Sequence, residues 1–269
     1  DAVAVGADSW WRAKKAAETL SVTWDFASHA GVSSDTIREQ LHAGLSAGDA
    51  RVGRNDGDVD RALGQAVKRI EADYEVPFLG HATMEPQNCT AHVTPDRVEI
   101  WAPTQDGETA LAIAADAAGV AADKVVVNKM MLGCGFGRRG IFQDFVRQAV
   151  LIAKEVSEPV KLVWTREEDT RHGFYRPVAS ARMTAGLDAD WIPIAWKIRT
   201  SGQSIIAAVS PRVMQFGVDR NFLQGLLEDM PYHVPNYRVD FAMRNTHVPV
   251  GVWRSVNHSQ NALFQESFV

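Results

Sequence analysis

The sequence predicts mixed helices and sheets, of the α/β or α+β class, with one small and one larger unit. Two observations support this prediction. Segments with apolar residues three or four positions apart, typical of amphipathic helices, alternate along the chain with short segments typical of strands. The 269 residues are 46% hydrophobic and 23% charged, which is ordinary for a globular protein and ample for a large core. No fixed-period repeat and no low-complexity segment is visible.

The first part of the chain is predicted to form a strand, a helix and a strand, followed by a polar linker. Apolar spacing predicts the helix, which Asp8 or Ser9 caps and which runs to Leu20. The alternation of Ser21–Trp24 predicts a half-buried strand. The end of the polar, glycine-rich stretch that follows, residues 51–57, is predicted to be an exposed surface loop.

The middle of the chain is predicted to add two helices and several strands. In order, we expect a helix at 59–72, strands at 73–77, 90–93 and 98–102, a helix at 108–118 and a strand from residue 125 onward. The first of these helices is predicted from an apolar stripe that includes Leu63, Val67 and Ile70. A turn at Thr94–Arg97 is expected to join the two later strands.

The last part is predicted to continue this alternation. We expect a helix at 142–153, a strand at 160–164, a short helix near residue 167, two strands within 177–204, a helix at 221–229 and a strand at 237–243. The two strands within 177–204 are expected to meet at a turn at Leu187–Asp190. The chain ends within a helical pattern, Ala262–Val269, so we expect it to be an internal piece of a larger protein.

Residues 133–140, Gly-Cys-Gly-Phe-Gly-Arg-Arg-Gly, form the most informative segment, called here the glycine loop. Its four glycines lie between an apolar strand and a helix. Glycine permits a sharp turn and lets a ligand approach the backbone amides. The N-terminus of the following helix adds unpaired N–H groups, and Arg138 and Arg139 add positive charge. The glycine loop therefore predicts a site for an anionic group such as a phosphate or an oxo ligand.

A tight turn without a ligand explains the glycine loop equally well on local evidence. The loop is similar to the dinucleotide fingerprint but contains an extra glycine, and it lacks the Gly-Lys-Ser/Thr ending of a nucleotide P-loop. Glu155 and Glu158 lie near the position, about 20 residues further on, where that fingerprint has its acidic residue. We interpret both as solvated charges at a helix end.

The composition argues against several classes of function. A net charge of −5 and a pI of about 5.9 argue against a nucleic-acid partner. Cys89 and Cys134 could pair, but they give neither a disulfide framework nor a metal signature. No apolar run approaches the roughly 20 residues of a membrane span. Eight tryptophans indicate large internal surfaces or a pocket with aromatic walls.

The histidines and acids form no metal-site pattern. His81, Glu85 and His92 are residue types that bind zinc, but their spacing fits no compact site. Glu167–Asp169 is better explained as the acidic first turn of a short helix, where carboxylates interact favourably with the helix dipole, than as a general base.

Several segments together are specific for one family. They are HATMEPQNCTAHV at 81–93, WAPTQ at 101–105, the glycine loop followed by DFVRQAVLIAK, VKLVWTREEDTRHGFYRP at 160–177, and WRSVNHSQNALFQESF at 253–268. In this order, and over essentially the whole chain, they resemble the molybdenum-binding large subunit of the xanthine oxidase / aldehyde oxidase family. Within that family the chain looks most like the isoquinoline 1-oxidoreductase beta subunit and membrane-bound aldehyde dehydrogenase subunits.

The resemblance implies roles for particular residues. In the family a glycine–phenylalanine–glycine stretch lies against the molybdenum centre, which assigns Gly135, Phe136 and Gly137 to cofactor binding, together with Arg138. Arg254 matches the arginine that, in several members, stabilises negative charge on a heteroaromatic substrate. A guanidinium suits that role because it is rigid and permanently charged.

The chain also departs from the family pattern. Many members have a glycine where Cys134 stands and an acidic residue soon after the loop, whereas this chain has Arg138 and Arg139, an arrangement that suits the isoquinoline-type branch. Leu79 or Gly80 stands where purine oxidisers have a glutamine that touches the oxo group, so we expect that contact to be absent.

The implied reaction is oxidative hydroxylation of an isoquinoline-like N-heteroaromatic compound, or oxidation of an aldehyde. The implied cofactor is molybdenum–molybdopterin in its cytosine dinucleotide form, with electrons passed to iron–sulfur clusters on a small partner subunit and a cytochrome as a further candidate acceptor. The family's glutamate base lies beyond residue 269, so we expect this piece to be inactive alone. Full-length members of this branch are exported to the periplasm or attached to the inner membrane.

The resemblance also implies a domain division. Residues 1–57 would be the end of a small hammerhead-like α/β domain plus linker, and residues 58–269 the first part of a larger molybdenum-cofactor-binding α+β domain with mixed sheets. The alternative is a stand-alone phosphate- or nucleotide-binding or interaction domain that uses the glycine loop. A parallel sheet with an acidic ribose ligand after the next strand would favour this alternative. Convergence of Gly135–Gly137 and Arg254 on one cavity would favour the molybdenum enzyme.

Overall fold

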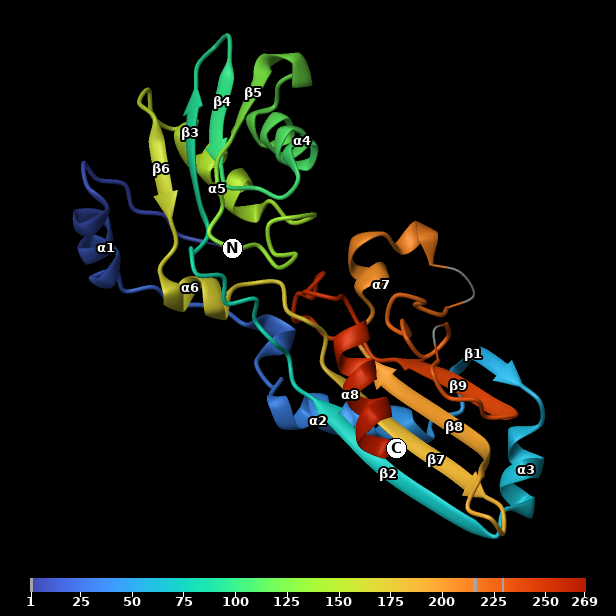
Figure 1. The fold of residues 1–269 in the computed structure, drawn as a ribbon. Coiled ribbons are helices and arrows are strands. Elements are labelled where there is room, and N and C mark those ends of the chain that lie inside the picture. Colours follow the sequence, from blue (N-terminus) through green and yellow to red (C-terminus); the bar gives the residue numbers. More distant parts are fainter. Residues whose placement is uncertain (1, 215–216, 229) are drawn as a thin grey trace. The chain divides into compact units, whose positions relative to one another are not determined.

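The computed structural model of the chain describes residues 2–214, 217–228 and 230–269 and divides it into two compact units (Figure 1). The glycine-loop unit consists of the residues up to Gly31 together with Ala82–Gly173. The five-stranded unit consists of Val32–His81 together with the residues from Phe174 onward. The chain therefore passes between the units three times, after Gly31, His81 and Gly173.

The glycine-loop unit contains a mixed four-stranded sheet. Its strands are β3 (Asn88–Val93), β4 (Val98–Ala102), β5 (Val125–Lys129) and β6 (Val160–Val163), in the spatial order β5-β4-β3-β6. Strands β4 and β5 are parallel, whereas β3 pairs antiparallel with both β4 and β6. The shorter elements of the unit are α1 (Trp10–Glu18), η1 (Ala27–His29), η2 (Ala122–Lys124) and α6 (Arg166–Arg171).

Two helices pack on this sheet, α4 (Gly107–Ala118) and α5 (Asp144–Ala153) (Figure 1). Helix α5 buries one stripe at helical spacing, Phe145, Val146, Ala149, Val150 and Ala153, in the same core as the inward side chains of β3 and β4. Helix α4 presents small alanines to this core, which lets it approach α5 closely. It begins at the cap residue Asp106 and ends at Gly119, which adopts a left-handed conformation.

The five-stranded unit is built on a second mixed sheet. Its strands are β1 (Arg51–Asp56), β2 (Lys68–Val76), β7 (Ala179–Leu187), β8 (Pro193–Gly202) and β9 (Asn236–Met243), in the spatial order β1-β9-β8-β7-β2. Strands β8 and β9 are parallel and the other pairs are antiparallel. The helices are α2 (Ser34–Ser46), α3 (Val59–Gln65), α7 (Ile205–Val209), η3 (Pro211–Val213) and α8 (His258–Phe268).

The two faces of this sheet are covered differently. Alternate residues of β7, including Ala179, Ala181 and Met183, share a core with Phe264 of α8 and with Phe222. The opposite face meets α2 and α3, where Val59, Ala62 and Leu63 of α3 pack on Ala195 of β8. Every strand in the centre of the sheet is therefore buried on both sides.

Many of the predicted elements are confirmed. They are the helix capped by Ser9, the helices at 108–118 and 142–153, the short helix near residue 167, the strands at 90–93, 98–102, 125 onward and 160–164, the two strands within 177–204, the strand at 237–243 and the C-terminal helix. The structure also confirms the mixed α+β class. The predicted division at residue 57 stays a prediction for the full-length protein, since the two units of the structure interleave along the sequence.

Five predictions of local structure were wrong. Residues 2–7 and 20–26 form no strand. The expected linker 51–57 contains β1, because its backbone pairs with β9 nearly two hundred residues later along the chain. The helix predicted at 59–72 ends at Gln65, and the chain continues as β2, which pairs with β7 along nine residues. This long ladder outweighs the helical spacing, because sheet pairing depends on partners that sequence periodicity does not show.

The helix predicted at 221–229 is replaced by turns in the described residues 221–228, and Asp229 lies outside them. The buried carboxylate of Asp219 accepts a hydrogen bond from the Phe222 amide at 3.0 Å, and Gly225 has a φ of +82°. A left-handed residue interrupts a helix, so the apolar side chains Phe222, Leu223 and Leu226 reach the core from turns instead.

Candidate functional site

The glycine loop follows β5, which is an edge strand of the four-stranded sheet. Helix α5 begins only at Asp144, so residues 141–143 separate the last glycine from the helix. The N-terminus of α5 therefore does not adjoin the central glycines directly, contrary to the expectation that the helix would extend the anion site.

The backbone of the loop is coiled and locally strained. Three residues have a positive φ: Cys134 at 75°, Phe136 at 55° and Gly137 at 98°. Two short turns close within the loop, where the Arg138 amide donates to the Gly135 carbonyl at 2.9 Å and the Gly140 amide to the Gly137 carbonyl at 3.1 Å. A left-handed conformation costs a non-glycine residue about 1–3 kcal/mol and persists only where the surroundings impose it. The contacts of the loop should therefore be strong.

Glu85, in the segment HATMEPQNCTAHV at 81–93, makes several of these contacts. Its Oε2 accepts a hydrogen bond from the Gly133 amide at 2.8 Å, and its own amide donates to the Gly133 carbonyl at 3.0 Å. The same carboxylate forms an ion pair with Arg139 at 3.1 Å. Glu85 thus fastens the entrance of the glycine loop, a structural role for a residue that the sequence offered only as a rejected metal ligand.

Arg139 lies inside the protein, with none of its side chain exposed. Its guanidinium donates to the carbonyls of Pro103 at 2.9 Å, Glu85 at 2.7 Å and Pro86 at 3.1 Å. Burial lowers the pKa of Arg139, and the nearby Glu85 carboxylate opposes that shift. A guanidinium nevertheless stays charged, because its ordinary pKa lies so far above neutrality. The Arg139 guanidinium therefore joins segments 81–93 and 101–105 to the glycine loop.

Arg138 is also almost completely buried, with 1% of its side chain exposed. It forms a two-point ion pair with Asp144 of α5, at 2.7 and 2.8 Å, and its guanidinium lies 5.6 Å from the centre of the Trp164 ring. The two arginines were expected to add positive charge at the surface of the loop. The structure instead places both charges in internal contacts, because each finds a carboxylate and buried carbonyl or aromatic groups there.

Thr104 and Gln105, from the WAPTQ segment, pack against the other side of the loop. The Gln105 amide donates to the Arg139 carbonyl at 2.9 Å, and Gln105 Oε1 accepts from the Gly137 amide at 3.0 Å. The buried Thr104 hydroxyl donates to the Arg139 carbonyl at 3.2 Å, and Gln143 donates to Thr104 Oγ1 at 2.8 Å. The glycine loop is therefore held from both sides by segments that the sequence singled out separately.

Some donors of the loop remain available to a ligand. Among the residues that the structure describes, the amides of Cys134 and Gly135 donate no hydrogen bond. Backbone N–H groups of this kind suit an oxo, phosphate or carbonyl oxygen. Within the described ranges, no cluster of three or more His, Cys, Asp or Glu residues could hold a metal ion. The loop thus fits the oxygen-rich periphery of a cofactor.

Arg254 lies in the five-stranded unit and is exposed. The preceding residues are anchored: the Val252 carbonyl contacts the His81 ring at 3.0 Å, and Trp253 Nε1 donates to the Gly80 carbonyl at 3.3 Å. The next residue, Ser255, has a φ of 60°, so the segment turns sharply just after Arg254. A fixed stem followed by a turn presents the arginine side chain at the surface.

The predicted site residues are thus divided between the units. Gly135, Phe136, Gly137 and Arg138 belong to the glycine-loop unit, and Arg254 belongs to the five-stranded unit. A joint role of the loop and Arg254 stays a prediction. Sequence reasoning missed Glu85 and Gln105 as supports of the loop. The only sequence signal for these two residues was that each lies in one of the segments, 81–93 and 101–105, that resemble the family.

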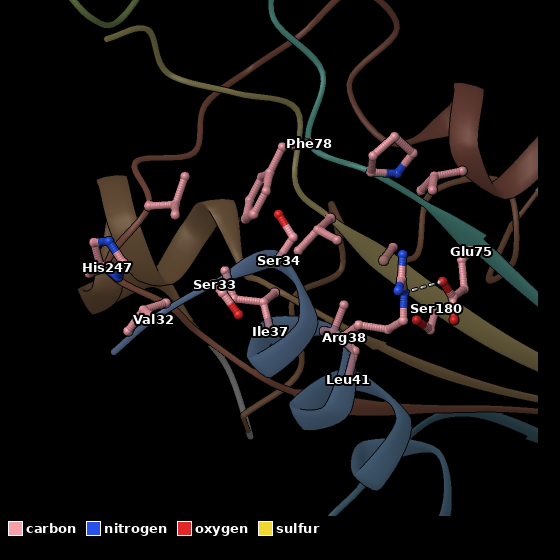
Figure 2. Close-up of a pocket in the computed structure, with 15 residues that line it drawn as sticks. Val32, Ser33, Ser34, Ile37, Arg38, Leu41, Glu75, Phe78, Ser180 and His247 are labelled. Atoms are coloured by element: carbon pink, nitrogen blue, oxygen red, sulfur yellow. Dashed lines mark hydrogen bonds and ion pairs between the residues drawn. The ribbon is translucent and has the colours of Figure 1, made fainter. Parts of the chain in front are cut away.

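The five-stranded unit also contains a pocket of about 630 Å³ beside the start of α2 and the end of β2 (Figure 2). Buried side chains of α2, Ile37 and Leu41, form part of its lining, and Arg38 and Glu75 form an ion pair there at 3.3 Å. Arg254 is not among the described residues that line this pocket. The pocket is therefore not the site that the sequence predicted.

A parallel sheet with an acidic ribose ligand after the next strand would have favoured the nucleotide-binding alternative. In the described sheet, β5 pairs only with β4, which comes earlier in the chain, and the strand that follows the loop, β6, pairs antiparallel with β3 at the other edge. Glu155 and Glu158 are exposed and precede β6. The doubly wound geometry of a dinucleotide site is therefore not formed here.

Comparison with known families agrees with the donor chemistry of the loop. The family described as the molybdopterin cofactor-binding domain matches residues 44–269. The chain belongs to this family. The match begins in α2 and includes the glycine loop, Gln105 and Arg254, so the molybdopterin cofactor-binding domain spans parts of both units.

Individual relatives of this chain are distant. It is 27% identical to the isoquinoline 1-oxidoreductase subunit beta of Brevundimonas diminuta, over 78% of this chain and 27% of the relative. It is 28% identical to the membrane-bound aldehyde dehydrogenase of Gluconacetobacter polyoxogenes, over 81% of this chain and 28% of the relative. The chain thus spans about a quarter of the length of these two relatives.

Solved structures show the same fold. Quinoline 2-oxidoreductase from Pseudomonas putida 86 superposes with a TM-score of 0.67 at 17% identity, over 85% of this chain and 30% of that one. The aldehyde oxidoreductase from Desulfovibrio gigas gives a TM-score of 0.64 at 18% identity, over 80% of this chain and 23% of that one. In the described part of the chain, no helix is long and apolar enough to cross a membrane.

Proposed function

We propose that this chain is the part of a molybdenum hydroxylase large subunit that contacts the molybdopterin cofactor, in an enzyme that hydroxylates an isoquinoline-like N-heteroaromatic compound or oxidises an aldehyde. The observation that carries the proposal is the family match over residues 44–269, which includes a loop with unpaired backbone donors. When bound, the cofactor supplies the two-electron redox chemistry, and the protein supplies binding, orientation and electrostatics.

Within this proposal the glycine loop binds the cofactor through its backbone. Gly135 offers an unpaired amide, Phe136 projects at the surface with 36% of its area exposed, and Gly137 supplies the conformation that closes the loop. Arg138 acts as a positioning residue, because its guanidinium is engaged by Asp144 and lies over Trp164. Its contribution to cofactor binding is to hold the Gly137–Arg138 peptide in place.

Arg254 is proposed to stabilise negative charge that develops on the substrate. A guanidinium remains charged at every physiological pH and donates in a fixed plane, so it can stabilise an oxyanion or a heteroaromatic anion without titrating. The anchored stem at Val252 and Trp253 fixes where its side chain begins.

The proposal extends to partners and location. Isoquinoline 1-oxidoreductase and nicotinate dehydrogenase relatives are named as subunits, which supports a partner subunit. This partner is proposed to carry the iron–sulfur clusters that receive the electrons, with a cytochrome as a further candidate acceptor. The cofactor is proposed to be the cytosine dinucleotide form of molybdopterin. One relative is named as membrane-bound, which supports attachment of the full-length protein to a membrane. By resemblance alone, the full-length protein is proposed to be periplasmic or associated with the inner membrane. The general base is proposed to lie outside these 269 residues, so this piece alone is expected to be inactive.

The substrate role of Arg254 can be tested in the full-length protein with its partner. We expect Arg254→Met to lower kcat/KM for isoquinoline about 10²–10³-fold, as loss of one oxyanion-stabilising donor does in other enzymes, while molybdenum content stays unchanged. Arg220→Met, which removes an exposed arginine of the same unit, is the control. Unchanged kinetics in Arg254→Met, or an equal loss in Arg220→Met, would reject the role.

A further inference from the structure

The side chain of Gln105 lies directly on the glycine loop. Its Oε1 accepts the hydrogen bond from the Gly137 amide at 3.0 Å, and its main-chain amide donates to the Arg139 carbonyl at 2.9 Å. The Gln105 side chain also packs closely against Gly135. A Cβ atom at Gly135 would lie 2.2 Å from Gln105 Oε1 and 2.5 Å from its Cδ, so only glycine leaves room for the carboxamide.

The hydrogen bond to Gly137 decides which way the Gln105 carboxamide is oriented. An N–H group can donate only to the oxygen of a carboxamide, so Oε1 must face Gly137 and Nε2 must occupy the other side. Gln105 is exposed, and among the described residues Nε2 has no acceptor. The carboxamide therefore covers Gly135 and presents the two N–H donors of Nε2 at the protein surface.

These donors lie next to others of the same kind. The amides of Cys134 and Gly135 also lack an acceptor among the described residues, and Gln105 packs on Gly135 itself. A group of neighbouring N–H donors that the protein leaves without an acceptor is suited to bind a ligand oxygen.

We propose that Gln105 is a further cofactor-binding residue of this chain. Its Oε1 fixes the Gly137 peptide, and its Nε2 donates to an oxygen acceptor of the molybdopterin cofactor beside the amides of Cys134 and Gly135. The inference rests on the proposed function and adds to it a side-chain donor that comes from the WAPTQ segment rather than from the loop.

Two substitutions separate the two halves of this role. Gln105→Glu keeps an oxygen that can accept from the Gly137 amide but replaces the outward donors with a negatively charged oxygen. Gln105→Met keeps the approximate length and removes both the acceptor and the donors. Gln148→Met is the matched control, because Gln148 lies in the same unit, is half-buried and accepts from Trp164 Nε1 at 3.0 Å.

The experiment uses the full-length protein with its partner subunit. Molybdenum and released pterin are measured per chain, and hydrogen exchange is followed on the peptide that contains Gly137. We expect Gln105→Glu to lower both contents at least about tenfold, since a lost hydrogen bond to a charged group and a new repulsion together exceed 1.4 kcal/mol. When the cofactor-free proteins are compared, exchange at Gly137 should stay at the wild-type rate in Gln105→Glu and rise in Gln105→Met, and Gln148→Met should resemble wild type in all measurements.

Each other result would contradict the inference. Wild-type molybdenum and pterin contents in Gln105→Glu would show that Nε2 makes no contact with the cofactor. Faster exchange at Gly137 in cofactor-free Gln105→Glu than in cofactor-free wild type would show that the side chain does not act through its acceptor oxygen. A wild-type protein without molybdenum would instead reject the proposed function itself, and the inference with it.

Discussion

Arg138 and Arg139 are adjacent in sequence and both buried, yet each supports the glycine loop in a different way. Arg139 joins the loop to the carbonyls of Pro103, Glu85 and Pro86, whereas Arg138 joins it to Asp144 of the following helix. Arginine suits both positions because its planar fork donates several hydrogen bonds in fixed directions. Lysine, with a single ammonium group, could not reach three carbonyls in the same way.

Arg139→Met should destabilise the protein strongly. The substitution removes the donors of three carbonyls and the ion-pair partner of Glu85, and each buried acceptor left without a donor costs about 1–3 kcal/mol. Arg147→Met, which removes an exposed ion pair with Asp116, should cost less than about 1 kcal/mol. Urea unfolding measures both variants, and equal losses would show that Arg139 has no special structural role.

The two cysteines should differ in reactivity. Burial raises the pKa of the Cys89 thiol to about 12, so at pH 8 its thiolate fraction is on the order of one in ten thousand, whereas Cys134 is half-buried in the loop. We expect a maleimide to label Cys134 in the native protein and Cys89 only after unfolding. Peptide mapping by mass spectrometry measures this. Native labelling of Cys89 as fast as that of Cys134 would contradict the packing of β3.

At the scale of elements, helix α4 connects the WAPTQ segment to the core and depends on its cap. The Asp106 carboxylate accepts from the Thr109 amide at 3.0 Å and from the Thr109 hydroxyl at 2.6 Å. The Thr109 hydroxyl and then its amide lower the pKa of Asp106 below its usual value. The cap lies directly after Gln105, so it also fixes the start of the helix beside the loop.

The low pKa of Asp106 makes the stability of the cap depend on pH. A carboxyl whose pKa is lower in the folded state stabilises the protein above the unfolded pKa, near 3.8, and this contribution disappears as the pH falls through the folded pKa. Asp106→Asn keeps a capping oxygen but does not titrate. Wild type should therefore be slightly more stable than Asp106→Asn at pH 7, and the difference should vanish well below pH 3.8. A difference that is constant across this range in urea unfolding would contradict the assignment.

Elements with a local signal could be predicted from the sequence, and those that depend on distant partners could not. Helices α4 and α5 could be predicted from their helical pattern, and β7 and β8 from the strand-like residues on both sides of a turn. Strand β1 looked like a linker because its partner, β9, lies far along the chain. Helical spacing hid the start of β2 for the same reason, since its nine-residue pairing with β7 decides its structure.

Some features of the candidate site could likewise be predicted from the sequence, and others could not. The glycine loop was visible in the sequence because its four glycines permit tight turns and close contacts, as between Gly135 and Gln105. The burial of Arg138 and Arg139 was not visible, because a charged residue next to glycines looks the same whether it faces solvent or a buried carboxylate. The supports Glu85 and Gln105 require contacts across 48 and 32 positions, which no local pattern contains.

At the scale of the whole molecule, the family match and the fold agree while the sequence identity is low. The molybdopterin cofactor-binding domain covers residues 44–269, and the structural neighbours share the fold at 17–18% identity. Packing and hydrogen bonding can preserve a fold through such divergence because many combinations of apolar residues fill the same core. The loop is held by a small number of specific contacts, and these are where divergence should be least tolerated.

The chain spans about a quarter of the relatives it matches, so function belongs to the full-length protein. The most direct test of the central claim is metal and pterin analysis, with ultraviolet–visible spectra, of the active full-length protein bound to its partner subunit. We predict stoichiometric molybdenum and a molybdopterin dinucleotide, with the absorption of iron–sulfur clusters from the partner. An active preparation that contains no molybdenum would contradict the account.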